Sequence, residues 1–174
     1  MAKEFPSDLT SLALAARDGD RVALTAFVRQ SQAEVWRVCR RLGDLESADD
    51  LTQEVYARAI TALPRFRGES SARTWLLSIA RHVAADRVRA NRRRGRDIAE
   101  PAPDAPDHAS LDAVERLIAG LDDDRRAAFV LTQVLGLSYA ETAEVCGVPI
   151  GTVRSRVARA RDELIETMRK AADG

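Results

Sequence analysis

The sequence predicts an all-α protein made of two small helical domains, joined by a flexible acidic Pro-rich linker, with the second domain ending in a helix-turn-helix. Apolar residues recur at helical spacing along most of the chain, and no stretch alternates cleanly with a period of two. Glycine and proline gather at the boundaries of these periodic segments. The stretch 138–164 has the start signal, turn glycine and apolar stripe of a helix-turn-helix. A chain of 174 residues can hold one or two domains, each with its own core.

Charge is balanced overall but is distributed in blocks. Lys plus Arg and Asp plus Glu each total 27. The segment 73–96 holds eight arginines and one acid, whereas 97–112 holds five acids and no Lys or Arg. The first block suits a nucleic-acid backbone, and the second suits an extended connector. A further hypothesis is that this acidic connector covers an arginine-rich DNA-reading surface in the free protein.

Two helices open the first domain. The first is predicted over 8–17, where the Asp-Gly-Asp sequence at 18–20 ends it. The second is predicted over 21–42, with a glycine at 43 to end it. Their core candidates, chosen by helical spacing, are Leu9, Leu12, Leu14, Leu24, Phe27, Val28, Val35, Trp36, Val38 and Cys39.

The third helix begins at a capping arrangement of Ser47 with Asp50 and closes at 63–64. Asp50 and Glu54 stand at i and i+4 with Gln53 beside them, and such like charges cost a helix roughly a few tenths of a kcal/mol. Either a basic or amide-rich partner surface explains this face, or the first turn is simply solvated. Catalytic carboxylates are disfavoured, because no nucleophile or histidine cluster accompanies them. The expected inner stripe is Leu51, Val55, Ala59 and Ala62.

A loop over 65–71 leads into a basic helix predicted over 72–92. Phe66 and Arg67 in the loop, beside the arginine face of the helix, suit a nucleic-acid backbone with aromatics near for base stacking. Trp75 fits either a core anchor or a base-stacking platform. The helix should bury Leu76, Ile79, Ala80 and Val83, and should expose Arg81, His82, Arg89 and Arg92.

The second domain follows a linker predicted over 95–107, in which three prolines fall within six residues. Its first helix is predicted over 111–121. Three aspartates at 122–124 should cap the next helix, over 125–135, and Gly136 should end it. The expected core positions of the two helices are Leu111, Val114, Leu117, Ile118, Phe129, Val130, Leu131 and Val134.

The helix-turn-helix has a complete set of local signals. Ser138 and Glu141 form a capping box, Gly147 can take the positive φ that ends the first helix, and Pro149 discourages its continuation. The second helix opens near Gly151 and should bury Val153, Val157, Ala160 and Leu164. Its opposite side carries Arg154, Ser155, Ala158 and Arg159, with Arg156 and Arg161 at the flanks. Arginine forks and small residues suit major-groove reading, and the alternative is a solvated basic face on an ordinary helical hairpin.

Several classes of function are disfavoured. No metal, cofactor or catalytic residue is expected, because Cys39 and Cys146 lie in different halves and the only histidines are His82 and His108. Reduced, partly buried thiols are expected instead. No apolar run approaches a membrane span and no signal peptide opens the chain, so a cytoplasmic protein is expected. A nucleic-acid hydrolase would lack a ligand cluster, and a dimeric operator-binding regulator would leave the 73–96 block unexplained.

Three segments together resemble one family. DLTQE at 50–54, TWLLSIARHVAADRVR at 74–89 and LSYAETAEVCGVPIGTVRSRVARAR at 137–161 are similar to the extracytoplasmic-function (ECF) branch of the bacterial sigma-70 factors. The resemblance covers nearly the whole chain, and the motifs are specific as a set. It implies a transcription initiation factor, not an enzyme, that binds core RNA polymerase and directs it to specific promoters. It also implies a sigma domain 2 over 1–95, a linker over 96–109 and a sigma domain 4 over 110–174.

The resemblance implies a role for each candidate residue. Asp50, Gln53 and Glu54 would dock on the β′ clamp helices of core polymerase. The residues that would hold the −10 element open as a single strand are Phe66, Arg67, Ser71, Arg73, Trp75, Arg81, His82 and Arg89. Those that would read the −35 duplex are Thr152, Arg154, Ser155, Arg156, Ala158 and Arg159. The β flap of polymerase and an anti-sigma factor are further expected partners. Relatives often carry Asn at the position of His82, which puts the −10 preference or its pH response in doubt.

Overall fold

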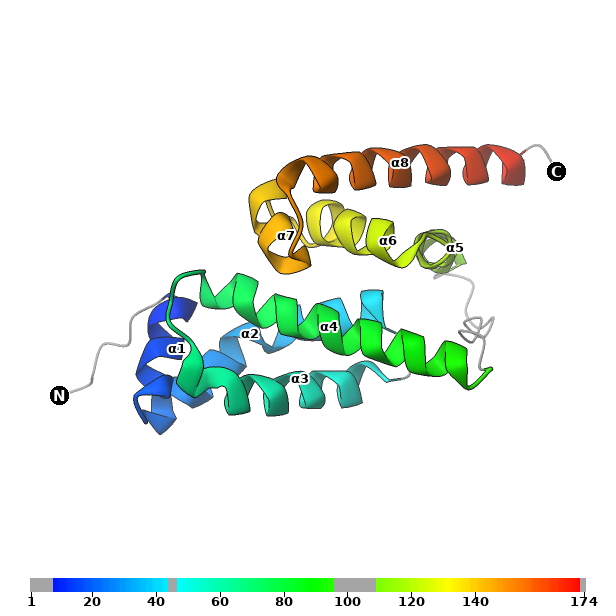
Figure 1. Cartoon of the computed structure of the whole chain (residues 1–174). Helices are drawn as coiled ribbons and strands as arrows, with labels where there is room; N and C mark the ends of the chain where they lie inside the picture. The colour runs from blue at the N-terminus through cyan, green and yellow to red at the C-terminus, as the bar shows by residue number, and fades with distance from the viewer. Residues whose placement is uncertain (1–7, 44–46, 96–108, 173–174) are drawn as a thin grey trace. The chain divides into compact units, whose positions relative to one another are not determined.

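The computed structural model describes residues 8–43, 47–95 and 109–172 and is helical throughout those ranges apart from short turns and loops (Figure 1). No strand occurs in the described ranges, so the all-α prediction is confirmed. The predicted acidic linker falls mainly on 96–108 and lies outside the described residues. Backbone contacts divide the chain into two compact units, Met1–Ala84 and Ala85–Gly174.

The first unit begins with two capped helices, α1 (Leu9–Arg17) and α2 (Arg21–Leu42). Asp8 accepts a hydrogen bond from the backbone N–H of Ser11, and Asp20 accepts from two backbone N–H groups at the start of α2. These short polar side chains satisfy donors that the first helical turn leaves unpaired. Both helices match the predicted bounds to within one residue.

The next elements are α3 (Ala48–Ala62), the 3-10 turn η1 (Leu63–Arg65) and α4 (Ala72–Arg93). The predicted capping role of Ser47 is wrong, because its side chain makes no capping hydrogen bond. Its φ of −103° and ψ of 8° are not the extended backbone that aims an N-cap side chain at the helix. The start of α3 is therefore fixed by burial of Ala48 and Leu51 rather than by its cap.

The core of the first unit comes from one side of each helix. Its largest fully buried side chains are Leu12, Phe27, Val35, Val38, Leu51, Val55, Leu76, Leu77 and Val83. A buried hydroxyl pair joins α2 to α3, where Ser31 Oγ and Tyr56 Oη lie 2.7 Å apart. Expected core residues that are only half-buried are Leu9, Leu14, Leu24, Val28, Trp36, Ala62 and Ile79.

Cys39 and Cys146 are both free, and both are buried more completely than the partly buried thiols that were expected. Burial raises the pKa of Cys39 to about 11, and a hydrogen bond with Thr52 partly opposes that rise. Because the thiolate is the reactive form, this cysteine is a packing residue and a poor nucleophile near neutral pH.

The second unit contains α5 (Ala109–Ala119), α6 (Asp123–Phe129), a π-helical turn (Val130–Val134, η2), α7 (Tyr139–Cys146) and α8 (Ile150–Ala172). The aspartate cap is confirmed, since Asp122 accepts from the backbone N–H of Asp124. The single helix expected over 125–135 is wrong, because its second half continues with π-helical hydrogen bonds. Val114 and Val134 were expected in the core but are 48% and 37% exposed.

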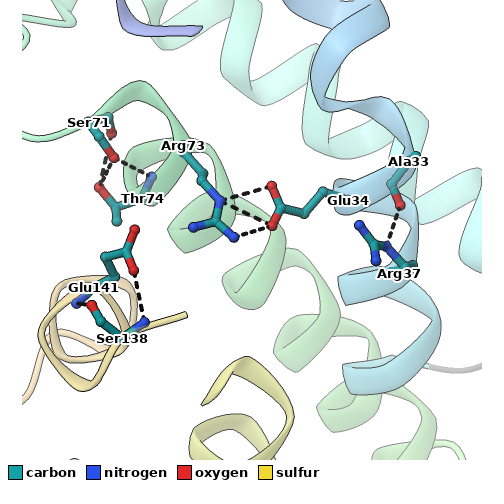
Figure 2. Close-up of polar contacts among 8 residues, drawn as sticks. All are labelled: Ala33, Glu34, Arg37, Ser71, Arg73, Thr74, Ser138 and Glu141. Atoms are coloured by element: carbon teal, nitrogen blue, oxygen red, sulfur yellow. Dashed lines mark hydrogen bonds and ion pairs between the residues drawn. The ribbon is translucent and has the colours of Figure 1, made fainter. Parts of the chain in front are cut away.

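The helix-turn-helix is formed by α7, Gly147 and α8. Glu141 N–H donates to Ser138 Oγ at 3.1 Å, and Ser138 N–H donates to Glu141 Oε2 at 2.8 Å, so the capping box is confirmed (Figure 2). Gly147 has a φ of 65° and ends α7 as expected. Val153 and Val157 are fully buried beside Ala128, whereas the expected Leu164 is only half-buried. This packing joins α8 to α6 and α7.

Alanine substitution at Gly147 and at Gly151 should change the stability of the helix-turn-helix in opposite directions. Gly147→Ala places a Cβ in the left-handed region and should lower the free energy of unfolding by about 1–2 kcal/mol. Gly151→Ala is the matched control, because that glycine lies in the first turn of α8 with nothing within 4 Å of an added Cβ. It should be neutral or stabilise by up to about 1 kcal/mol. Urea unfolding followed by circular dichroism measures both, and equal losses would contradict the turn geometry.

Candidate functional site

The outer face of α8 is the most open part of the candidate DNA-reading surface. Arg154, Ser155, Ala158 and Arg159 are all exposed, on the side opposite the buried valines. Ser155 Oγ donates to the backbone carbonyl of Thr152 at 2.9 Å, which keeps this short side chain close to the helix. Among the described residues, Arg154 and Arg159 have no ion-pair partner. Two extended guanidinium forks beside small side chains can approach a groove edge closely.

The flanking arginines of α8 serve the fold. Arg156 is half-buried and donates through Nη2 to Asp124 near the start of α6. Arg161 Nη2 donates to Gln133 Oε1 at 2.6 Å. These side chains hold α8 against α6 and η2, so Arg156 is less available to DNA than its neighbours. Helical spacing places Arg156 and Arg161 at the flanks of the basic face, but it cannot show which side chains of the fold hold them.

Arg126 is a residue that the sequence reasoning missed. It is only 3% exposed, and it donates through Nη1 to the Ala119 carbonyl and through Nη2 to Asp123. Burial lowers the pKa of this guanidinium, and the charge of Asp123 opposes that effect. The side chain ties the end of α5 to the start of α6. An arginine within an acidic cap is the only sequence signal, and it does not reveal burial.

The loop after η1 brings two aromatic candidates together. The rings of Phe66 and Trp75 lie 4.9 Å apart between centroids with 41° between their planes. Phe66 is only 5% exposed, so its ring packs within the unit and presents little surface to a nucleic-acid base. Trp75 is half-buried, which leaves part of its ring accessible above a fixed partner. Trp75 therefore has features of both interpretations, because its ring packs against Phe66, as a core anchor would, and the residue stays partly exposed, as a stacking platform would.

Two further candidates at the start of α4 are engaged within the unit (Figure 2). Arg73 donates to Glu34 on α2 through Nε at 3.1 Å and through Nη2 at 2.6 Å. Ser71 Oγ accepts from the backbone N–H of Thr74 at 3.1 Å and lies 2.9 Å from the Thr74 hydroxyl. Both side chains fix the first turn of α4. Arg67, by contrast, is 82% exposed in its side chain and lies 3.7 Å from Glu69.

The outer face of α4 carries the remaining basic candidates. His82 is exposed, and its Nδ1 lies 2.7 Å from the carbonyl oxygen of Ser78. Arg89 is exposed and pairs with Asp86 one turn earlier at 2.6 Å. Arg81 is half-buried. This face can contact a polyanion mainly through exposed side chains whose partners are local and solvated.

The acidic face of α3 is exposed as expected. Asp50, Gln53 and Glu54 all reach solvent, and Glu54 pairs with Arg58 one turn on. Just beside them, Asp49 accepts a hydrogen bond from the indole N–H of Trp36 at 2.9 Å. These two contacts orient the carboxylates of Glu54 and Asp49 at the edges of the face.

Within the described ranges, no group of three or more His, Cys, Asp or Glu side chains is arranged to hold a metal ion. No helix in those ranges combines the length and apolar character that crossing a membrane requires. The candidate residues lie on three surfaces, on α3, on the loop after η1 with α4, and on α8.

Comparison with known families matches both halves of the chain. The family description "Sigma-70 region 2" matches residues 27–94, and "Sigma-70, region 4" matches residues 111–164. The first match contains the acidic face of α3 and the 66–75 loop, and the second contains the helix-turn-helix. The two matches coincide with the motifs from which the family resemblance was drawn.

Curated relatives agree with these matches. The chain is 53% identical over 165 residues to the probable RNA polymerase sigma-C factor of Mycobacterium bovis, covering 90% of this chain and 89% of that protein. It is 35% identical to the RNA polymerase sigma-H factor of Pseudomonas aeruginosa, covering 84% and 86%. The resemblance to extracytoplasmic-function sigma factors is thereby confirmed, and the chain is similar to a mycobacterial sigma-C factor over nearly its whole length.

A solved structure shares the fold. The structure of CnrH in complex with the cytosolic domain of CnrY has a TM-score of 0.77 and 26% identity, and the match covers 96% of this chain and 100% of that chain. The sigma factor RpoE from Bartonella quintana, solved with the anti-sigma factor NepR, has a TM-score of 0.72 at 24% identity. The second likeness bears on the fold alone.

Substitution of methionine for the buried Arg126 and for the exposed Arg154 should change the free energy of unfolding by different amounts. Arg126→Met removes the arginine donor of the Ala119 carbonyl and one of the two arginines that pair with Asp123, the other being Arg92, and should lower the free energy of unfolding by about 1–3 kcal/mol. Arg154→Met removes no described ion pair and should change it by less than about 0.5 kcal/mol. Chemical denaturation of the two variants side by side gives the comparison. A loss for Arg154→Met as large as for Arg126→Met would mean that the α8 face is structural.

Proposed function

This chain belongs to the extracytoplasmic-function branch of the sigma-70 family, and we propose how its residues carry out the task of that family. It is a transcription initiation factor that binds core RNA polymerase and directs it to specific promoters. The observation that carries the residue-level proposal is the division of its arginines. Some are held by carboxylates of the fold, and others stand exposed on the faces of α4 and α8.

The acidic face of α3 binds polymerase in this proposal. Asp50, Gln53 and Glu54 dock on the β′ clamp helices, which would supply a basic or amide-rich surface in addition to Arg58, the local ion-pair partner of Glu54. The hydrogen bond from Trp36 to Asp49 keeps the start of the helix in one orientation. The cost of placing two carboxylates one turn apart is then recovered on binding.

The loop and α4 hold the melted −10 element. Trp75 offers a partly exposed ring, and stacking on an aromatic side chain contributes about 1–3 kcal/mol per base. Arg67, Arg81, His82 and Arg89 lie along the path of the strand and contact its backbone. Phe66, Ser71 and Arg73 support this surface from beneath, because their side chains are already buried or bonded. Opening DNA costs about a few kcal/mol per disrupted step, which these contacts offset.

The outer face of α8 reads the −35 duplex. Arg154 and Arg159 reach the base edges or phosphates, while Ser155 and Ala158 allow the helix to approach closely. Thr152, in the first turn, contacts the backbone of the duplex. Arg156 stays with Asp124 and sets the angle at which α8 is presented.

The remaining assignments follow from the same function. The boundaries that we propose are a domain 2 over 1–95, a linker over 96–109 and a domain 4 over 110–174. The family match to 27–94 supports assigning all of α4 to the first domain, whereas backbone contacts divide the chain after Ala84. Polymerase supplies the catalysis, its β flap is a second docking point, and the factor works in the cytoplasm where polymerase is. Because CnrH, at 26% identity, was solved in complex with the cytosolic domain of CnrY, a protein that binds the factor itself is proposed here, and we expect that partner to be an anti-sigma factor.

Transcription in vitro tests the function and the α3 face together. Purified core polymerase with a promoter library should give transcripts only when this protein is added, and their start sites should share spaced −35 and −10 elements. Asp50→Ala with Glu54→Ala should abolish these transcripts, because the acidic face is lost. Its stability should change by less than about 0.5 kcal/mol, since only exposed side chains are removed.

The matched control for that variant is Glu166→Ala. Glu166 is an exposed acid that pairs with Lys170 one turn on, as Glu54 pairs with Arg58, but it lies far along α8. Transcription by this control should equal that of the unaltered protein. Transcripts that persist at full yield in the Asp50 and Glu54 variant would place polymerase binding elsewhere.

The division among the α8 arginines gives a second functional prediction. Arg154→Ala should weaken binding of the promoter duplex by about 1–3 kcal/mol and relax the preference at one −35 base pair. Arg161→Ala, the control, removes an arginine that is bonded to Gln133 and should leave base preference unchanged. Electrophoretic or anisotropy titration of the holoenzyme at two salt concentrations measures both. If the Arg154 variant lost affinity equally for every −35 sequence, its contact would be to phosphate only.

A further inference from the structure

Helix α1 carries no candidate residue and lies before the segment that matches the family. One of its faces nevertheless touches the loop that is proposed to hold the −10 strand. Thr10, Leu14 and Arg17 stand at i, i+4 and i+7, and so lie along one side of the helix. Its fully buried residues, Leu12 and Ala13, serve the core. The face toward the loop is therefore distinct from the face that packs the domain.

Arg17 holds the beginning of the loop. Its Nη1 donates to the backbone carbonyl of Phe66 at 3.2 Å. Its Nε and Nη2 donate to Asp18 at 2.8 and 3.2 Å, so the carboxylate fixes the plane of the guanidinium. Because the planar guanidinium is bound by Asp18 on one side, the direction of its remaining hydrogen bond to the Phe66 carbonyl is restricted. The backbone at the Phe66 ring is thus tied to the last residue of α1.

Thr10 holds the end of the loop. The backbone N–H of Ala72, the first residue of α4, donates to Thr10 Oγ1 at 3.1 Å. That N–H is one of the donors that a helix start leaves unpaired, and Ser71 serves another at Thr74. The first turn of α4, which carries Trp75, is therefore capped partly from α1. A residue 62 positions earlier in the chain fixes where that turn begins.

Leu14 holds the middle of the loop. Gly68 has a φ of 74°, and a Cβ built on it would lie 3.4 Å from Leu14 Cδ2. The isobutyl group thus packs directly against the turn, at a position that only glycine takes without backbone strain. Three contacts, at the start, middle and end, leave the short loop between η1 and α4 little freedom.

We propose that Thr10, Leu14 and Arg17 are positioning residues that hold the 66–72 segment and the Trp75 ring in the geometry that captures the open −10 strand. This inference rests on the proposed function of the loop. A segment that binds a splayed base discriminates best when it is already ordered before binding. Otherwise part of the binding free energy is spent on ordering the loop. The α1 face supplies that order, and it does so without touching DNA.

The test measures discrimination, which a merely structural role would not change. Holoenzyme is assembled from core polymerase and the full chain. Its dissociation constant is measured for a promoter fork from the library experiment, with a duplex −35 element and a single-stranded −10 element. A second fork has one −10 base changed. The ratio of the two constants does not depend on the fraction of protein that is folded, so simple destabilisation leaves it unchanged.

The variants separate the hydrogen bonds from the bulk of the side chains. Thr10→Val and Arg17→Met remove one acceptor and one donor at similar size, and each should reduce the −10 discrimination ratio by about threefold to tenfold. Thr10→Ser keeps the acceptor and should restore the ratio. Thr25→Val and Arg29→Met are the controls on α2, and they should match the unaltered protein, because within the described residues neither side chain bonds the 66–72 segment. The Thr25 hydroxyl donates to the Arg21 carbonyl of its own helix, and Arg29 is exposed.

The outcomes distinguish this inference from the function on which it rests. If the unaltered protein discriminates at −10 and Thr10→Val and Arg17→Met keep the same ratio, the α1 proposal is overturned and the proposed function stands. If the unaltered protein itself shows no −10 discrimination, the proposed role of the loop fails and this inference fails with it. Discrimination at −35 should be unchanged in every variant, and a parallel loss there would also overturn the proposal.

Discussion

One-sided burial of each helix is the constraint on which this structure depends. In α8 the side chains of Val153 and Val157 are removed from water beside Ala128, and burying an aliphatic side chain of this size contributes about 1.5–3 kcal/mol. Rotating α8 about its axis would expose both valines and bury arginines in their place. The packing of α6 and α7 therefore decides which residues reach solvent. The face that reads DNA is the face that the core does not use.

The same constraint divides the arginines, and here sequence alone is insufficient. Arg73 and Arg81 lie on the same basic helix, and the sequence gives no reason to treat them differently. In the structure, however, Arg73 forms an ion pair with Glu34 on α2. That pairing joins residues 39 positions apart and has no local signal. Arg156 is likewise held by Asp124 across 32 positions. An arginine becomes structural when the fold brings an acid to it, and composition cannot show where that happens.

Signals confined to a few residues could be predicted. The capping box at Ser138 and the positive φ at Gly147 each depend on one or two neighbours, and both are confirmed. The cap expected at Ser47 is wrong because its backbone takes another conformation, which no side-chain pattern specifies. Contacts such as Thr10 with the start of α4 were not predicted, because they require the three-dimensional arrangement of α1, the loop and α4. Local sequence signals thus predicted the fold class and the motifs. Contacts between residues distant in the sequence determine which candidate side chains remain exposed and able to bind a partner.

A chain with no net charge can still bind a polyanion because its charges are neutralised unevenly. Where an acid is held against an arginine inside the fold, as at Arg126 and Asp123, neither charge contributes to the field around the protein at longer range. The exposed Arg154 and Arg159 have no such partner among the described residues, so their charges act at longer range. The outer face of α8 therefore presents positive charge to its partner although the whole chain is neutral. Salt should weaken the DNA contacts in proportion to the exposed arginines that meet phosphate, and not in proportion to the total of 27 basic residues.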